Sequence, residues 1–185
     1  MQLVALDLGT RMGFACGKAG HGAIPRSGAM ILKEPQEPTA RAYSNLQRWL
    51  CGIIETVPKP ERRSMLVVKE SPLALAAFKQ LGNAAATVEF TYKLHGSVEA
   101  VCDSYRILCR DVADATIRKH FIGKSNAGKR TATKAAVIHR AKLLKLIPAD
   151  CTDDNRADAV ALFDYAAHTF ARASGGDLVL FGDAA

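Results

Sequence analysis

Two carboxylates, Asp7 and Glu70, each follow a short apolar run of the chain. The first run covers residues 3–6 and leads into a turn that contains Gly13, and the second covers residues 65–68. Apolar runs of this length that are bounded by turn signals are typical of buried strands. A carboxylate at the end of such a strand is costly to bury unless a positive charge meets it. If the two strands are neighbours in one sheet, we expect Asp7 and Glu70 to converge at one edge of that sheet.

Both carboxylates also have simpler explanations. Asp7 could cap the glycine turn that follows it, as aspartate does in many turns. Glu70 could stand at an exposed strand end, since Lys69 beside it favours a position that faces solvent. The chemical interpretation therefore depends on whether further carboxylates meet these two.

A third acidic group, residues 153–158, stands at the start of an apolar helix. With about 100° of rotation per residue, Asp154 and Asp158 lie about 40° apart around this helix and can point at the same place. Asn155 faces the same side, so Asp153, Asp154 and Asn155 are alternatives for completing a site there. For Asp153, compensation of the positive helix N-terminus is the better explanation. That explanation is weak for Asp158, which lies one turn inside an otherwise apolar face.

Four carboxylates around one point repel one another and raise one another's pKa. Divalent cations that prefer oxygen ligands relieve this repulsion, and magnesium or manganese suits such a set. Two ions about 4 Å apart can activate a water and stabilise the leaving oxygen in phosphodiester hydrolysis. The sequence therefore predicts a catalytic site with two Mg²⁺ ions, for which Mn²⁺ can substitute, on Asp7, Glu70, Asp154 and Asp158.

The elements around these acids indicate how they are positioned. Strand patterns over residues 13–16, 22–32 and 106–112 join the two runs above and bring the number of strands to five. Apolar residues at helical spacing predict helices, whose ranges are 39–57, 73–94, 113–121, 131–147 and 152–173. This order predicts an α/β protein with a central mixed five-stranded sheet that is flanked by helices.

The composition narrows the class of protein. A chain of 185 residues suits one domain with a real core. No stretch approaches the ~20 apolar residues that cross a bilayer, and no signal-peptide pattern is seen, so we expect a cytoplasmic protein with no membrane partner. The five cysteines are odd in number and scattered, which argues against a disulfide framework or a zinc site.

Positive charge is concentrated in one part of the chain. The net charge is 25 − 18 = +7, and residues 104–156 alone hold twelve Lys and Arg against five Asp. A loop with glycine, lysine and arginine can bring cations and backbone N–H groups to phosphates, although a solvated helix face is the alternative. The candidate DNA-binding residues are Arg118, Lys119, Lys124, Lys129, Arg130 and Lys134. Of these, Lys129 is the candidate for neutralising charge that builds up on the phosphate.

Five short motifs in one order resemble the RuvC-type Holliday-junction resolvases, in a divergent bacterial or phage form. Two of them are the strands that end at Asp7 and Glu70. The others are Leu-Gly-Asn-Ala at 81–84, Gly-Lys-Ser-Asn-Ala at 123–127 and Asp-Asn-Arg-Ala-Asp-Ala at 154–159. Each motif is weak by itself, and the resemblance depends on their order and spacing over residues 2–171.

The resemblance implies an RNase H-like nuclease domain over residues 1–173, followed by a tail over 174–185 that forms a short strand or is disordered. It also implies a homodimer that nicks four-way DNA junctions in pairs with magnesium. By position, the family's catalytic acids match Asp7, Glu70, Asp154 and Asp158, and its DNA-contacting basic residues match Arg118 and Lys129.

The sequence departs from the family at two places. The last two acids of the family are often three residues apart, whereas Asp154 and Asp158 are four apart. An aromatic wedge often stands three residues after the second acid, where this chain has Leu73, and Phe78 follows one turn later. Leu73 is therefore a candidate DNA-binding residue, but it lacks the aromatic ring with which the family opens the junction.

The function hypothesis is a structure-selective endonuclease that resolves four-way junctions. The alternatives are a catalytically inactive architectural protein that binds branched DNA and a nuclease for other branched DNA. Sugar kinases and actin-like ATPases share the Asp-x-Gly-Thr strand, but their two related domains do not fit into 185 residues. The range 73–94 is apolar most of the way round a helix, and such a helix must be covered on more than one side. A second copy of the chain related by a two-fold axis would cover it.

Overall fold

The computed structural model describes the whole chain except residues 21, 73–84, 126–127 and 172–185. Its centre is one sheet whose strands are β1 (Gln2–Asp7), β2 (Arg11–Lys18), β3 (Arg26–Ile31), β4 (Leu66–Glu70) and β5 (Leu108–Val112). The strand order is β3-β2-β1-β4-β5. The first three strands form an antiparallel meander, whereas β4 is parallel to both β1 and β5. The predicted mixed five-stranded sheet is therefore confirmed.

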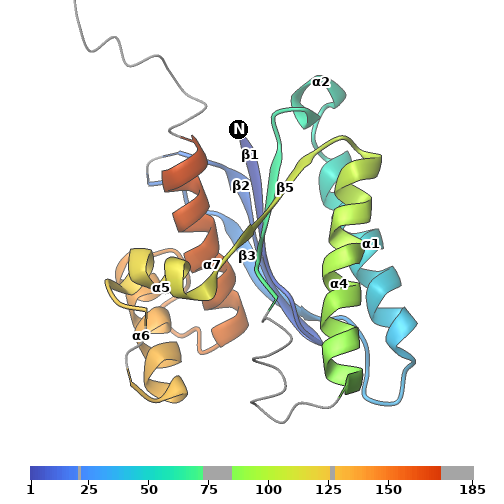
Figure 1. Cartoon of the computed structure of the whole chain (residues 1–185). Coiled ribbons are helices and arrows are strands. Elements are labelled where there is room, and N and C mark those ends of the chain that lie inside the picture. The colour runs from blue at the N-terminus through green and yellow to red at the C-terminus, as the bar shows by residue number, and fades with distance from the viewer. Residues whose placement is uncertain (21, 73–84, 126–127, 172–185) are drawn as a thin grey trace, which may run out of the picture.

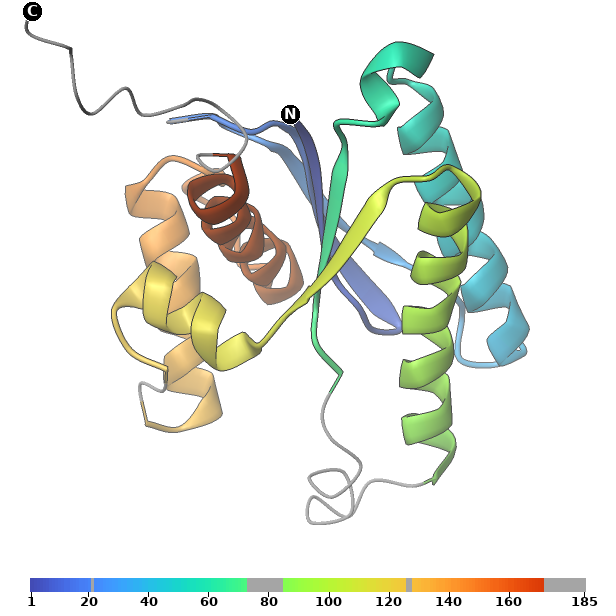
Figure 2. The same ribbon diagram turned by 45° about the horizontal axis from the view of Figure 1, so that its top comes forward.

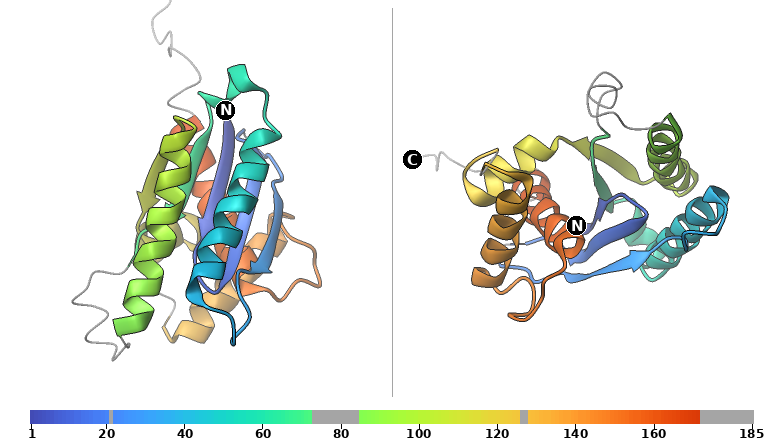
Figure 3. Two further views of the ribbon diagram at one scale, coloured as in Figure 1. Left: turned by 90° about the vertical axis from the view of Figure 1, so that its right-hand side faces the viewer. Right: turned by 90° about the horizontal axis from the view of Figure 1, so that it is seen from below.

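Helices cover both faces of the sheet (Figures 1 and 2). One layer consists of α1 (Thr39–Glu55) and α4 (Ala85–Ser104), with the short α2 (Lys59–Arg62) at one end. The other layer consists of α5 (Asp114–Ile122), α6 (Arg130–Leu143) and α7 (Asp154–Ala166), and a π-helical segment, Ala167–Ala171, continues α7. The end-on view in Figure 3 shows the sheet between these two layers.

Strand periodicity decides which helix layer each strand residue meets. On β1, Leu3 and Ala5 belong to the core under α7, whereas Val4 and Leu6 belong to the core under α1 and α4. Side chains alternate between the faces of a strand, so Asp7 falls on the α7 face. The same alternation on β4 places Leu66, Val68 and Glu70 on that face.

The expected helix over 73–94 differs from the observed one. Residues 73–84 lie outside the described residues, and α4 continues past Leu94 to Ser104. Val98, Val101 and Cys102 are buried and extend the apolar stripe of α4, which stabilises the helix across Gly96. The prediction that the helix ends near Leu94 is wrong for that reason.

Smaller differences concern other elements. The third strand begins at Arg26 instead of Gly22. The segment after Pro58, expected only to end a helix, forms the short helix α2. Among the described residues, no helix is long and apolar enough to cross a membrane. The tail over 174–185 lies outside the described residues, and the domain boundary at residue 173 stays a prediction.

Candidate active site

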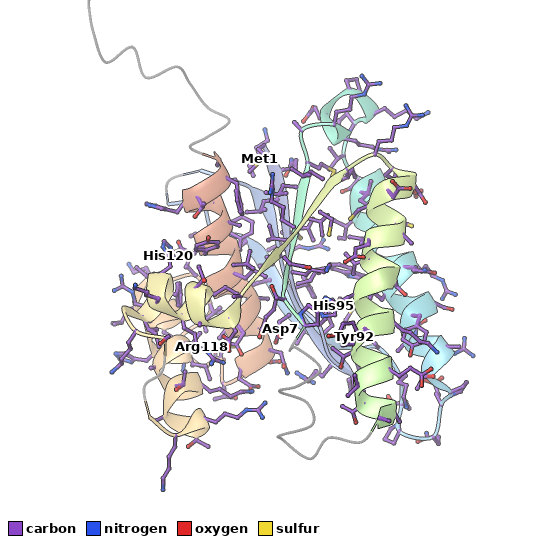
Figure 4. The ribbon with its side chains drawn as sticks, in the orientation of Figure 1. Met1, Asp7, Tyr92, His95, Arg118 and His120 are labelled. Carbon is purple, nitrogen blue, oxygen red and sulfur yellow. The ribbon has the colours of Figure 1, made fainter. Side chains whose placement is uncertain are left out.

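Asp7 and Glu70 are the last residues of neighbouring parallel strands. The pairing of Leu6 with Lys69 places the two carboxylates side by side at one edge of the sheet. Both side chains line one cleft, together with Ser71, Thr91 and Arg130. Asp7 lies at the lower end of the sheet in Figure 4. The predicted convergence of the two strand ends is confirmed.

The explanation of Glu70 as an exposed strand end is wrong. It depended on Lys69 facing solvent, but Lys69 is 1% exposed. Glu70 itself is half-buried. Burial of a carboxylate without an ion-pair partner is costly. Solvation of a strand end therefore does not explain the position of Glu70.

A close approach between β2 and α7 brings the second pair of acids to the sheet. A Cβ atom on Gly13 would lie 1.9 Å from the backbone oxygen of Asn155, so only glycine permits this approach. Asp154 is the first residue of α7 and Asp158 lies one turn later. The helix axis thereby passes over β1 and β2 with its acidic end beside Asp7. Gly13 lies within β2, opposite Asp7, so it acts through helix packing, and the prediction that it lies in the turn is wrong.

Asp153 has a structural role, as its position indicated. Its carboxylate is the N-cap of α7 and accepts a hydrogen bond from the Arg156 backbone N–H at 3.2 Å. It also forms an ion pair with Arg11. This use of both oxygens leaves Asp154 and Asp158 as the acids of α7 that face the candidate site.

The acids raise one another's pKa in the way that a crowded anionic site predicts. Burial raises the pKa of Asp7 well above its ordinary value, and the charges of Glu70 and Asp158 raise it further. Burial, followed by the charge of Asp114, raises the pKa of Glu70 to about 7. The pKa of Asp158 is raised to about 6, again mainly by burial. These side chains are therefore close enough to interact electrostatically.

Lys134 of α6 is the cation closest to this cluster. It donates a hydrogen bond to the Asp154 carboxylate, and this bond lowers the pKa of Asp154. Its charge also opposes the rise in pKa at Asp7, Glu70 and Asp158. Lys134 was predicted only as a DNA-binding residue, and the structure places it among the acids.

Asp114 and Arg118 of α5 complete the electrostatic surroundings. They form an ion pair at 2.6 Å, and both charges act on Glu70 and Asp158. Asp114 was not predicted from the sequence. A signal was available, because β5 ends beside Glu70 in the register Glu70–Val112 and Asp114 starts the next helix.

The donor set suits a hard divalent cation. All four predicted ligands are carboxylates, which magnesium and manganese prefer. Burial, followed by the charges of neighbouring acids, raises the pKa of Asp7, Glu70 and Asp158, whereas the hydrogen bond from Lys134 lowers the pKa of Asp154. Among the described residues, no group of three or more His, Cys, Asp or Glu side chains is already placed to hold a metal ion. Lys134 supplies the nearest positive charge instead. The carboxylate donor set therefore fits a divalent metal ion, and binding of the ion would bring the ligands into their coordinating positions.

The remaining predicted DNA-binding residues lie around this cluster. Arg130, the first residue of α6, lines the cleft with Asp7 and Glu70. Lys119, Lys124 and Lys129 are exposed on α5, on the following loop and at the N-cap of α6. Leu73 lies outside the described residues. The roles of all these residues stay predictions.

The sheet topology, the two helix layers and the acids at the strand ends define the RNase H-like fold of the RuvC type. No family model matches the sequence, and no curated protein matches it. Solved structures do match. RuvC of Thermus thermophilus in complex with a Holliday junction substrate has 14% sequence identity over 95% of this chain and 97% of its own, with a TM-score of 0.64.

Two further structures agree with this match. Another structure of T. thermophilus RuvC has 15% identity over 94% of this chain and 97% of its own, with a TM-score of 0.62. The yeast mitochondrial Holliday junction resolvase has 10% identity over 88% of this chain and 75% of its own, with a TM-score of 0.53. The resemblance to RuvC that the sequence motifs indicated is thus confirmed at the level of the fold.

Proposed function

We propose that this chain is a metal-dependent endonuclease that resolves four-way DNA junctions by paired nicking. The observation that carries the proposal is the convergence of Asp7, Glu70, Asp154 and Asp158 from β1, β4 and α7 at one end of a RuvC-type sheet. Electrostatic coupling among these acids supports a shared site. One structural neighbour was solved in complex with a Holliday junction substrate, which directs the proposal to branched DNA.

The four carboxylates are the proposed ligands of two magnesium ions, for which manganese can substitute. Bound ions of this kind supply an activated water and stabilise the leaving oxygen in phosphodiester hydrolysis. The chain itself contributes the fixed strand ends, which hold Asp7 and Glu70 side by side. The first two turns of α7 contribute Asp154 and Asp158.

Basic side chains have two proposed tasks. Arg130 lines the cleft and is positioned to bind the phosphate of the strand to be cut. Lys119 and Lys124 are exposed and would contact phosphates further along the DNA. Lys129, next to Arg130, is the proposed residue for neutralising charge that builds up on the phosphate. Lys134 keeps the acids partly neutralised in the absence of other cations, and its charge would remain available to the phosphate when the metal ligands are engaged.

Paired cuts require two sites, and a homodimer is the proposed source. A two-fold axis repeats one site on each copy of the chain. The described part of α4 packs Leu94 into the core and leaves Tyr92 39% exposed. This arrangement supports contact of the outer side of α4 with a second copy.

Two alternatives make different predictions. An inactive architectural protein would bind junctions without cutting them, and a nuclease for other branched DNA would cut flaps or forks better than junctions. The set of four acids favours an active enzyme. Partial burial of carboxylates destabilises the folded state, and binding of DNA alone does not require them.

The experiment is a nicking assay on end-labelled four-way junction, flap, fork and linear duplex in Mg²⁺, Mn²⁺ or EDTA. We expect symmetric nicks in the junction with either metal and none in EDTA. Preferential cutting of flaps or forks would redirect the substrate assignment. Tight binding of the junction without any cut would support the architectural alternative.

A further inference from the structure

A buried lysine lies beside the candidate site but on the opposite face of the sheet. Lys69 precedes Glu70 on β4, and its side chain is 1% exposed. Its ammonium contacts the carboxylate of Asp111 on β5, the Glu99 carboxylate at 2.8 Å and His95 Nδ1 at 3.2 Å, the last two on α4. This lysine unit of Lys69, His95, Glu99 and Asp111 therefore joins β4, β5 and α4.

The lysine unit defines the chemical form of His95. An ammonium has three N–H donors and no acceptor, so His95 must accept the hydrogen bond at Nδ1. A neutral imidazole that accepts at Nδ1 carries its proton on Nε2. Burial, followed by the charge of Lys69, lowers the pKa of His95 to about 4. A neutral His95 ring at pH 7 is consistent with this lowered pKa.

His95 also borders the candidate site. It is 5% exposed, and it lines the cleft that Asp7, Glu70 and Arg130 share. Figure 4 shows His95 from α4 and Asp7 from β1 at the same end of the sheet. Because Nδ1 is directed at Lys69, the remaining donor, Nε2–H, is on the side of the ring away from the lysine.

We propose that His95 is a DNA-contacting residue whose Nε2–H donates a hydrogen bond to a phosphate oxygen in this cleft. Lys69 is then a positioning residue that fixes the ring in the donating form. The inference rests on the proposed function, since it takes DNA as the molecule that enters the cleft. A neutral donor suits this place, because an imidazolium would pair with the nearby carboxylates and compete with a divalent cation for them.

Stability alone does not account for the lysine unit. Burying an ammonium is costly even when carboxylates pair with it. The neighbouring residue Val67 fills the same face of β4 with an apolar side chain, and an apolar residue at position 69 could continue that packing. Orientation of the His95 ring by the Lys69 ammonium is a role that an apolar residue at position 69 could not fill.

The first test measures the ring form directly, by ¹⁵N–¹H correlation NMR of the histidine side chains at pH 7. The His95 signal is assigned by its loss in His95→Gln. We expect the Nε2–H form in the wild-type protein and a shift of that signal when a short DNA duplex is added without divalent metal. An Nδ1–H ring, or a signal that DNA does not move, would overturn the proposal.

The second test uses amides as substitutes for the two ring nitrogens. The glutamine amide nitrogen reaches the position of Nε2, whereas that of asparagine reaches only the position of Nδ1. We expect His95→Asn to slow single-turnover nicking of saturating junction about tenfold or more, and His95→Gln to stay within about threefold of wild type. His139→Asn, at an exposed histidine of α6, is the matched control. Equal rates for the two His95 variants would contradict a DNA contact through Nε2–H.

Failure of the proposed function can be distinguished from failure of the inference about His95. If the wild-type chain cuts no branched DNA with Mg²⁺ or Mn²⁺, the nuclease assignment is lost. The shift of the His95 signal on addition of DNA is still measurable in that case, and it decides the contact by itself. Lys69→Met supplies a further readout, since loss of the lysine is expected to give a mixture of both ring forms.

Discussion

One end of the sheet holds half-buried carboxylates on one face and a buried lysine on the other, and the charges on the two faces have different surroundings. On the α7 face, the acids Asp7, Glu70 and Asp158 repel one another, and their pKa values are raised. On the α4 face, the Lys69 ammonium is surrounded by groups that accept its hydrogen bonds. In the first arrangement Lys134 offsets the repulsion only in part, whereas in the second the ammonium is paired with two carboxylates.

The acids on the two faces also differ in their exposure to water. Glu99 and Asp111 have side chains that are 57% and 44% exposed, so water also stabilises their charges. The acids of the α7 face are partly buried, and water stabilises them less. Repulsion that is retained in the folded state is a feature of sites that act on substrates or bind metals. The α7 face is therefore the one that we propose to be reactive, and the α4 face is its proposed support.

The largest expected effect comes from removing a carboxylate of the α7 face. Asp7→Asn and Asp158→Asn should each lower the nicking rate at least about 10²-fold, the scale for loss of a principal electrostatic group. Binding of the junction in Ca²⁺ or EDTA should persist, since the basic side chains are intact. Asp153→Asn is the matched control and should be mild, because asparagine is also a good N-cap. A nicking rate near that of wild type in either of the first two variants would remove the metal-site assignment.

A large effect is also expected where α7 meets β2. Gly13→Ala introduces a Cβ that overlaps the Asn155 carbonyl, so the start of α7 must move away from Asp7. Overpacking of this kind costs about 1–3 kcal/mol of the free energy of unfolding, and we expect the nicking rate to fall about tenfold or more because the acids separate.

The control for this prediction lies on the same strand. A Cβ on Gly17 would meet the Pro25 Cα at 3.7 Å, an ordinary contact. Gly17→Ala should therefore leave both thermal stability and nicking near wild type. If Gly13→Ala and Gly17→Ala behave alike in both assays, the close approach of α7 does not position the acids.

Repulsion on the α7 face should also be visible as pH-dependent stability. The folded-state pKa values of Glu70, about 7, and Asp158, about 6, lie above their ordinary values, so the folded state binds these protons more tightly than the unfolded state. The stability that they contribute is present below about pH 4 and is lost as the pH rises through about 6 to 7. Without divalent metal, the free energy of unfolding should fall over that range.

Thermal melts in EDTA at pH 5 and pH 7.5 measure this loss. Glu70→Gln should reduce the difference in Tm between the two pH values, by about 2–4 °C for each kcal/mol of repulsion that is removed. Glu61→Gln, at an exposed glutamate of α2, is the control and should match wild type. A difference in Tm that Glu70→Gln leaves unchanged would contradict the electrostatic account.

A smaller effect is expected at the exposed basic residues. Lys129→Ala and Arg130→Ala should each weaken binding of the junction and reduce the slope of log K against log salt by about one unit for each lost phosphate contact. The effect should be similar for different DNA sequences, because phosphates carry no sequence information. Unchanged affinity and slope in both variants would make this segment a solvated surface.

The sequence predicted those parts of the site that depend on local patterns. The apolar runs before Asp7 and Glu70 identified two buried strands, and the 3.6-residue period of the last helix placed Asp154 and Asp158 on one side. These features are encoded within a few residues of each acid. The sequence left open whether these two strands are neighbours, and the structure shows that β1 and β4 pair in parallel.

Other parts depend on contacts between distant residues and have no local signal. Lys69 and Asp111 are 42 positions apart, and the alternation of strand residues alone cannot show that a lysine is buried. The overlap that Gly13 avoids involves a carbonyl of α7. A basic pattern identified Lys129 and Lys134 equally, and only the packing of α6 on α7 shows that Lys134 reaches Asp154.

The comparison of the two faces is tested most directly by metal binding in the absence of DNA. Electron paramagnetic resonance of Mn²⁺ at pH 7.5 measures the free ion in the presence of the wild-type protein, Asp7→Asn and Asp111→Asn. The account predicts that the wild type and Asp111→Asn bind Mn²⁺ equally, whereas Asp7→Asn loses most of the binding. Equal binding by all three proteins, or a loss that is confined to Asp111→Asn, would contradict the assignment of the metal site to the α7 face.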